Sequence, residues 1–384
     1  VMPRSHGTTN DRGKGETDVN IENLAMSSLS PYNESSDEFQ TRMVDILNSA
    51  ALNVAIGIGS KVGLFDALGD AAEPLTAKEL AETTELNPRV VREWLGVVVS
   101  GNILEVHPGD YYSLPPHRAN FLCRKGGENN LALYCQEIPI LTQCVYQDVL
   151  ETFKTGSGIP YSKYPTFQDF MGQLADQKHE DSLLQTFLPS IDGMVDRLKE
   201  GNMRVMDLGC GQGLAISLLA REFPNSSFVG IDLDEDAIAK AQETSRDLEN
   251  LSFVVLDATC IHEHEFAESF DYVVAFDAIH DLCHPEEVLK GIRDALKPGG
   301  IFSMIDIKAD SHIIQNKDHP MGPMLYTVSL MHCMQVAMVD GGRGLGMMWG
   351  RQQAISMLKE AGFRNIKELE IPQDGFNSHY MAEK

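Results

Sequence analysis

Basic residues are scarce in this sequence of 384 residues. Lys and Arg together number 31 against 56 Asp and Glu, which gives a formal net charge of −25 at pH 7. A negative field of this size repels the phosphate backbone of nucleic acids, and no local basic patch offsets it. The sequence therefore predicts no nucleic-acid partner.

Paired cysteines and long apolar runs are also missing. The seven cysteines form no C-x-x-C pair, which argues against a disulfide framework and against a zinc knuckle. No apolar run approaches the roughly 18 to 20 residues of a membrane span. The first residues have no apolar core of a secretory signal. We therefore expect free thiols, no membrane partner and a cytoplasmic location.

The length of the chain suggests two folded units and a tail. Residues 1–37 are rich in Ser, Asn, Gly, Asp and Glu and are predicted to form a disordered tail. We expect a winged helix-turn-helix domain over residues 38–117, a helical connector over 118–200, and a ligand-binding α/β domain over 201–384.

Helix and strand signals support the winged helix. Apolar residues recur at helical spacing over residues 39–68, which predicts one or two buried helices. Thr76 and Glu79 form a capping-box pattern, and Pro88 follows at the start of a second helix. Two short strands around a turn are then predicted over residues 102–114.

The second helix of this unit is poorly equipped to read DNA. It offers Arg89 and Arg92, with Glu93 beside them. Major-groove recognition requires basic and amide side chains on this helix. A dimerisation or lid domain is therefore the favoured interpretation.

From Met203 onward short apolar runs alternate with helical stretches. This rhythm is typical of a parallel sheet covered by helices on both faces, a doubly wound α/β domain. The predicted strands are Val205–Leu208, Phe228–Ile231, Phe253–Leu256, Tyr272–Phe276 and Ile301–Ile305.

A glycine-rich turn follows the first of these strands. Gly209, Gly211 and Gly213 would expose backbone N–H groups and a helix N-terminus to a ligand. The dinucleotide pattern G-x-G-x-x-G fails by one position, where Leu214 stands. Asp207, at the strand end, would repel a pyrophosphate but attract a cationic amino group.

Further acids end the next two strands. Asp232 is placed to hold both hydroxyls of a ribose. Asp257 can accept from an adenine amine while the backbone N–H of Ala258 donates to the ring. Leu233 and Phe276 complete the predicted cofactor-binding set.

These motifs together resemble the class I S-adenosylmethionine-dependent methyltransferases. The resemblance rests on Asp207–Gly213, Asp232, Asp257-Ala258 and Leu296–Gly300. Nearly the whole chain after the predicted tail is similar to the small-molecule members with an N-terminal winged helix, through residues 159–165, 276–281, 318–320, 331–334 and 344–350. It implies a seven-stranded Rossmann-like fold, S-adenosyl-L-methionine as cofactor, a homodimer, and methyl transfer to an O, N or S atom of a small molecule.

Catalytic candidates follow the fourth strand. His280 could act as a general base with Asp281 as its partner, although His280 could equally cap or pack against the cofactor. Histidine spacings match no zinc pattern, so no metal is predicted. The predicted substrate-pocket residues are Tyr161, Tyr164, His332 and Trp349.

Two alternatives remain open at this level. In the first, the winged helix binds DNA and the α/β domain only senses the cofactor. In the second, the enzyme methylates a protein. The acidic balance of the chain argues against the DNA-binding alternative.

Overall fold

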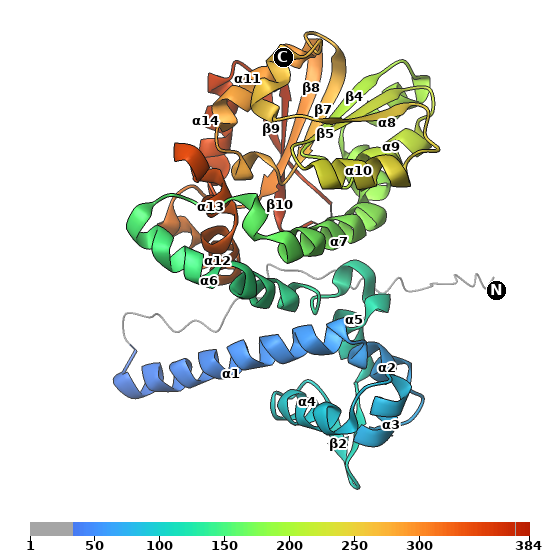
Figure 1. Ribbon diagram of the computed structural model, residues 1–384, viewed down its shortest axis with the longest axis vertical. Coiled ribbons are helices and arrows are strands. Elements are labelled where there is room, and N and C mark those ends of the chain that lie inside the picture. Colours follow the sequence, from blue (N-terminus) through green and yellow to red (C-terminus); the bar gives the residue numbers. More distant parts are fainter. Residues whose placement is uncertain (1–33, 373) are drawn as a thin grey trace, which may run out of the picture.

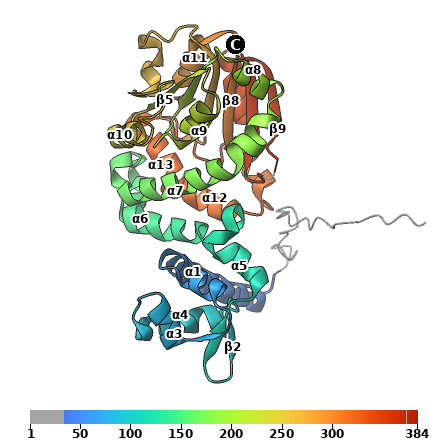
Figure 2. The ribbon, with the colours of Figure 1, turned by 90° about the vertical axis from the view of Figure 1, so that its right-hand side faces the viewer.

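The computed structural model describes residues 34–372 and 374–384. The winged-helix unit and the long helix α1 lie at one end of the molecule and the large sheet at the other (Figure 1). Helices of the connector run between them, and the view turned by 90° shows the same three-part arrangement (Figure 2). The sheet carries the predicted ligand site, so the connector lies between that site and the winged helix.

The helical region before the winged helix differs from the prediction. It consists of α1(Ser36–Lys61) and α2(Leu64–Asp70). Ser35 and Glu38 form a capping box, so the helix begins inside the segment expected to be a tail; the rest of that tail prediction lies outside the described residues. The predicted burial is wrong for the first half of α1, because every residue from Ser35 to Ala51 is exposed.

The winged helix-turn-helix is confirmed. It comprises β1(Leu75–Thr76), α3(Ala77–Thr83), α4(Pro88–Ser100), β2(Glu105–His107) and β3(Tyr111–Ser113), with strand order β1-β3-β2. The Thr76–Glu79 capping box starts α3, and Asn87 caps α4 just before Pro88. Trp94 of α4 donates its indole N–H to the Ala55 carbonyl of α1 at 2.8 Å, which ties the two helices together.

The connector is mostly helical and is interrupted by a loop. Its first part holds α5(Pro116–Leu122), the 3₁₀ turns η2(Arg124–Asn129) and η3(Tyr134–Gln136), and α6(Glu137–Thr155). After the loop through Gly158 come η4(Tyr161–Lys163) and α7(Pro165–Ser182). It ends with the π-helical turn η5(Leu183–Phe187), η6(Leu188–Ser190) and α8(Met194–Glu200).

A seven-stranded sheet forms the α/β domain, in the order β6-β5-β4-β7-β8-β10-β9. The predicted doubly wound, Rossmann-like fold is confirmed. β4 to β8 run parallel, whereas β10 is antiparallel to both of its neighbours. The strands are β4(Arg204–Leu208), β5(Ser227–Asp232), β6(Leu251–Val255), β7(Phe270–Phe276), β8(Leu296–Ile307), β9(Arg364–Glu370) and β10(Asn377–Glu383).

Helices cover both faces of the sheet because successive strand residues point to opposite sides. Val205 packs into one core cluster and Met206 into another. The covering elements are α9(Leu214–Glu222), α10(Glu235–Thr244), η7(Ala258–Glu263), η8(Ile279–Asp281), α11(Pro285–Ala295) and α14(Arg351–Glu360). The segment predicted to interrupt the rhythm forms η9(Ile313–Asn316), α12(Gly322–Met331), α13(Cys333–Ala337) and η10(Val339–Gly341), and α12 packs against α6 of the connector.

Candidate active site

The turn between β4 and α9 leaves open space in front of its backbone. Gly209 and Gly211 have φ of 73° and 53°, values that glycine adopts without strain. A Cβ on Gly209 would lie 2.8 Å from the Cβ of Ala278, so a side chain there would collide. A Cβ on Gly211 would meet nothing within 4 Å. The turn can therefore accept a ligand directly against its backbone.

Two carboxylates flank this turn. Asp232, at the end of β5, accepts the Gly211 N–H at 2.8 Å and the Asp234 N–H at 2.9 Å. Asp207, at the end of β4, is buried, and its carboxylate accepts no hydrogen bond from the residues that the structure describes. Burial, reinforced by the nearby Asp232, raises the pKa of Asp207 to about 7. A cationic group would therefore find an unpaired acid beside the open turn.

The other predicted cofactor residues lie at the ends of neighbouring strands. Asp257 follows β6 and is exposed; its Oδ1 accepts the backbone N–H of Thr259 at 2.9 Å, which leaves the second oxygen for a ligand. Ala258 starts the turn η7, and Leu233 follows β5 with 63% of its surface exposed. Because parallel strands end at the same edge, these residues and the glycine turn lie along one edge of the sheet.

Helix α7 is fastened across the C-terminal ends of the central strands. His179 packs edge-on against Phe276, with ring centroids 4.7 Å apart. Burial lowers the pKa of His179 to about 3, so its ring is neutral there. Lys178 contacts Asp374, in the β9–β10 loop, at 2.9 Å. Phe276 therefore contacts α7 of the connector, and its predicted contact with a cofactor stays a prediction.

The predicted catalytic pair lies in a buried chain of charged groups. His280 Nδ1 is 2.8 Å from Oδ1 of Asp306 on β8, and His280 Nε2 is 3.3 Å from Oδ1 of Asp281. Burial opposes charge on the imidazole, but the two carboxylates outweigh it and hold the pKa of His280 well above its usual value. Neither ring nitrogen is free, so the general-base role of His280 stays a prediction.

Two of the predicted pocket residues contact or adjoin Asp281. The Tyr161 hydroxyl donates to Oδ2 of Asp281 at 2.9 Å, and His332 Nδ1 lies 3.9 Å from the same oxygen. Tyr164 stands edge-on to the His332 ring at 4.8 Å, while its hydroxyl donates to the Met331 carbonyl at 2.7 Å. The structure thus brings Tyr161, Tyr164 and His332 together beside the predicted catalytic pair.

Trp349 is placed elsewhere. It is buried in the core cluster between the sheet and the helices α11 and α14, whereas Tyr164 belongs to the separate cluster of the connector. The structure therefore does not group Trp349 with the other three pocket candidates.

Sequence reasoning missed Asp306 and gave no specific role to Cys333. Asp306 is fully buried, and Cys333 Sγ lies within 4.8 Å of ligand atoms of both His280 and Asp281. A signal for Asp306 exists in the sequence, since this carboxylate directly follows the fifth predicted strand and stands between Ile305 and Ile307. A charge in such a run is costly unless it is paired.

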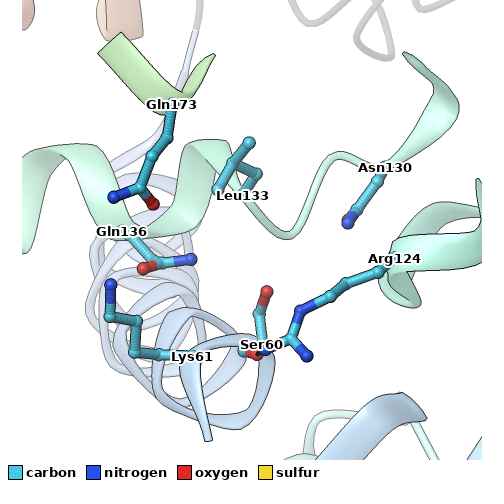
Figure 3. Close-up of a pocket in the computed structure, with 7 residues that line it drawn as sticks. All are labelled: Ser60, Lys61, Arg124, Asn130, Leu133, Gln136 and Gln173. Carbon is cyan, nitrogen blue, oxygen red and sulfur yellow. Dashed lines mark hydrogen bonds between the residues drawn. The ribbon is translucent and has the colours of Figure 1, made fainter. Parts of the chain in front are cut away.

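A polar hollow of about 270 Å³ lies away from this cluster, between the end of α1 and the connector (Figure 3). Lys61 and Arg124 bring positive charge to it, but Arg124 also contacts Asp66 at 3.3 Å. Its remaining lining is polar apart from one leucine: Ser60, Asn130, Leu133, Gln136 and Gln173.

The fold and the glycine turn have the arrangement that the resemblance to class I S-adenosylmethionine-dependent methyltransferases implied. Family comparison agrees with this class: residues 199–362 match the family described as "Methyltransferase domain", and residues 50–124 match the "Rv2258c-like winged HTH domain". The chain therefore combines a segment similar to a methyltransferase domain with a segment similar to a winged helix-turn-helix domain, the two domain types that its motifs predicted.

Curated relatives match parts of the chain. A sterol 24-C-methyltransferase of Debaryomyces hansenii is 30% identical over 221 residues, which cover 56% of this chain and 51% of that protein. A phthiotriol/phenolphthiotriol dimycocerosates methyltransferase of Mycobacterium tuberculosis is 32% identical over 113 residues, 29% of this chain and 41% of that one. The matches thus span about half or less of these relatives.

Solved structures share the fold along most of the chain. A putative O-methyltransferase of Nostoc punctiforme superposes with a TM-score of 0.67 at 18% identity, covering 92% of this chain and all of that one. Human N-acetylserotonin methyltransferase, solved in complex with SAM, gives 0.67 at 16% identity, with coverage of 94% and 99%. At these identities the likeness concerns the fold, including both the winged helix and the sheet.

Proposed function

We propose that this protein binds S-adenosyl-L-methionine and transfers its methyl group to a small molecule. The observation that carries the proposal is the pairing of an open glycine turn with a buried, unpaired acid: Gly211 leaves room for a ligand, and Asp207 offers it a carboxylate. A cofactor with a cationic amino acid moiety satisfies both. Dinucleotides fit poorly, because their pyrophosphate would meet the Asp207 carboxylate.

The residues at the strand ends fit the rest of this cofactor. Asp232 is held by two backbone N–H groups at the end of β5, where it can accept ribose hydroxyls. Asp257 keeps one oxygen free for an adenine amine. The bound cofactor would supply a methyl group already activated on a sulfonium, so the protein must orient the acceptor and exclude water.

The acceptor region of this proposal is the group around Asp281. Tyr161 and His332 come from the connector and from the α12–α13 junction, and both face the carboxylate of Asp281. Together with the buried His280 they form a polar centre walled by the aromatic residues Tyr164 and Phe167. Small-molecule pockets commonly combine apolar walls with a few polar groups. The sterol and lipid methyltransferases among the relatives support a small-molecule acceptor.

Calorimetry with the purified chain tests the cofactor part of the proposal. We expect one equivalent of S-adenosylmethionine or S-adenosylhomocysteine to bind. NADH should neither bind with comparable affinity nor displace the bound cofactor. Gly211→Val should lose this binding while its far-UV circular dichroism stays unchanged. Tight NADH binding, or undiminished cofactor binding by the variant, would refute the assignment of the turn.

We also propose that the chain forms a homodimer through α1. Every residue in the first half of α1 is exposed in the part of the chain that the structure describes, and large apolar side chains there are more than one third exposed: Phe39, Met43, Val44, Ile46 and Leu47. Most helical stability in proteins comes from the packing of an apolar face, and exposed apolar patches mark interfaces. Exposed apolar residues of α6, among them Leu150 and Phe153, offer a second copy a matching surface.

Light scattering measures whether the chain is a dimer. Because α1 also meets the length and composition criteria of a membrane span, a second experiment measures whether the chain partitions into lipid vesicles. We expect a dimer at micromolar concentration, a monomer for Leu47→Glu, and a dimer for the control Ile313→Glu, whose residue is 77% exposed elsewhere. A monomeric wild type, or one that partitions into neutral vesicles, would contradict the proposal.

A cytoplasmic location and the absence of a nucleic-acid partner complete the proposal. All seven cysteines are free in the structure, as suits a reducing compartment. On α4, Arg89 is paired with Glu93, which leaves this helix with little positive charge for DNA.

A further inference from the structure

Four groups with metal-binding chemistry, three of them buried and Asp281 half-buried, meet beside the predicted cofactor site. His280 and Asp281 come from the turn after β7, and His332 and Cys333 come from the junction of α12 and α13. His280, Asp281 and Cys333 each offer a ligand atom, and these atoms lie within 4.8 Å of one another. His332 Nδ1 is 3.9 Å from Asp281. The chain fold thus joins two pairs of residues that lie far apart in the sequence.

Outer hydrogen bonds already orient two of these groups. Asp306 holds His280 Nδ1 at 2.8 Å, which directs Nε2 toward the centre of the cluster. Tyr161 donates to Oδ2 of Asp281 at 2.9 Å, and the other oxygen, Oδ1, is buried with no hydrogen-bond partner in the described chain. In metal sites, a ligating histidine usually donates its other ring N–H to a carboxylate, and a ligating carboxylate usually accepts a hydrogen bond from a neighbouring group.

We infer that His280 Nε2, Asp281 Oδ1 and Cys333 Sγ bind a divalent transition metal, with Zn²⁺ the expected ion. Mixed nitrogen, oxygen and sulfur ligands favour zinc over magnesium or calcium, which prefer oxygen alone. Ligand atoms of tetrahedral zinc are about 3.3 to 3.8 Å apart, from the usual metal–ligand lengths. His280 Nε2 and Asp281 Oδ1 are 3.3 Å apart, so the ion requires mainly an approach of Cys333.

Metal ligands bind in their deprotonated form, so the thiol proton of Cys333 and any proton on His280 Nε2 would leave as the ion enters. His280 Nδ1 would then carry the ring proton and donate it to Asp306, 2.8 Å away.

Three protein ligands would leave one position of the ion open, as in catalytic zinc sites. The metal site itself does not depend on the proposed function, but the role given to the ion here rests on methyl transfer being the reaction. An acceptor hydroxyl or thiol bound at the open position would lose its proton more readily, since zinc lowers the pKa of its ligands. Alcohols, phenols and thiols are therefore the acceptor class that the site fits, and His280 would hold the metal instead of taking the proton.

Cobalt serves as a spectroscopic probe of the thiolate ligand. The full chain is freed of metal, mixed with one equivalent of Co²⁺, and its absorption is recorded. We expect a thiolate-to-cobalt charge-transfer band that Zn²⁺ abolishes. Cys333→Ser should lose the band, whereas Cys283→Ser should keep it, because Cys283 lies outside the cluster on the loop that follows η8.

Zinc stoichiometry after dialysis gives the second measurement. We expect one equivalent in the wild type and in Cys283→Ser, and none in Cys333→Ser or His280→Gln. Asp306→Asn should weaken zinc binding by about 10- to 100-fold, the usual effect of losing an outer partner. Thermal unfolding of each apo variant shows that it is folded.

Cofactor calorimetry on the same samples separates this inference from the proposed function. Failure to bind zinc, or an equal cobalt band in Cys333→Ser, would overturn the metal site even if S-adenosylmethionine binds normally. Zinc binding without cofactor binding would uphold the metal site and refute the methyltransferase proposal.

Discussion

The ionisation of Asp207 should control how cofactor affinity depends on pH. Its carboxyl is buried beside Asp232, which raises its pKa to about 7 in the free protein. Below that pH the acid carries a proton, which a cationic ligand must displace in order to form an ion pair. Binding therefore releases a proton, and affinity rises with pH up to the region where the carboxylate is already ionised.

The size of this effect follows from the fraction of ionised Asp207. A group with a pKa of about 7 is roughly one tenth ionised at pH 6 and about three quarters ionised at pH 7.5. The dissociation constant of S-adenosylhomocysteine should therefore fall about eightfold over this interval, or about 1.2 kcal/mol. Above this interval the amino group of the ligand itself begins to lose its charge.

Calorimetry in two buffers of different ionisation enthalpy measures both the affinity and the number of protons released. Asp207→Asn should bind more weakly and with an affinity that does not vary over the interval. Asp257→Asn is the matched control, because it removes an acid from the same crevice and retains Asp207. An affinity of the wild type that is independent of pH, or equal slopes in wild type and Asp207→Asn, would refute this account of the site.

The remaining predictions concern the turn, the connector and the winged helix. Asp232→Ala should weaken cofactor binding by roughly 1.5 to 3 kcal/mol, the value of hydrogen bonds to a charged group, and an unchanged calorimetric affinity would remove it from the ribose role. Gly211→Val should abolish binding, since its side chain would occupy the open space before the turn; equilibrium dialysis with labelled cofactor checks this. Burial raises the pKa of Glu137 to about 7, above its unfolded value, so its neutral form stabilises the fold at low pH and this contribution is lost as pH rises through about 7. Glu137→Gln should accordingly raise the unfolding temperature more at pH 8 than at pH 5, and the opposite order would contradict the burial argument. The winged helix should not bind duplex DNA in fluorescence anisotropy at moderate salt, because Arg89 is paired with Glu93; salt-sensitive micromolar binding would show the reverse.

Local signals predicted much of this architecture. The Thr76–Glu79 capping box and the Asn87-Pro88 helix start depend on neighbouring residues, and both appear as expected. The strand carrying Asp207 and the glycine turn after it are likewise encoded in one short segment. These features needed no knowledge of distant contacts.

Features that depend on distant packing could not be read in the same way. The apolar spacing of α1 indicated a helix, but spacing does not tell whether the apolar face is covered by the same chain or by another. Trp349 looked like a pocket residue in the sequence and is a core residue in the structure. The meeting of His280 with Asp306, and of Asp281 with Cys333, results from the order of the strands and from the docking of α13 on the turn after β7.

Methyl transfer itself is measured by following the methyl group of the cofactor. The chain is incubated with S-adenosylmethionine carrying an isotopically labelled methyl group and with a metabolite extract, and the mixture is analysed by mass spectrometry. The account predicts S-adenosylhomocysteine together with a small molecule whose mass has increased by one labelled methyl group, and neither product with Gly211→Val. The absence of S-adenosylhomocysteine after incubation with the metabolite extract, or label that appears only on protein, would contradict methyl transfer to a small molecule.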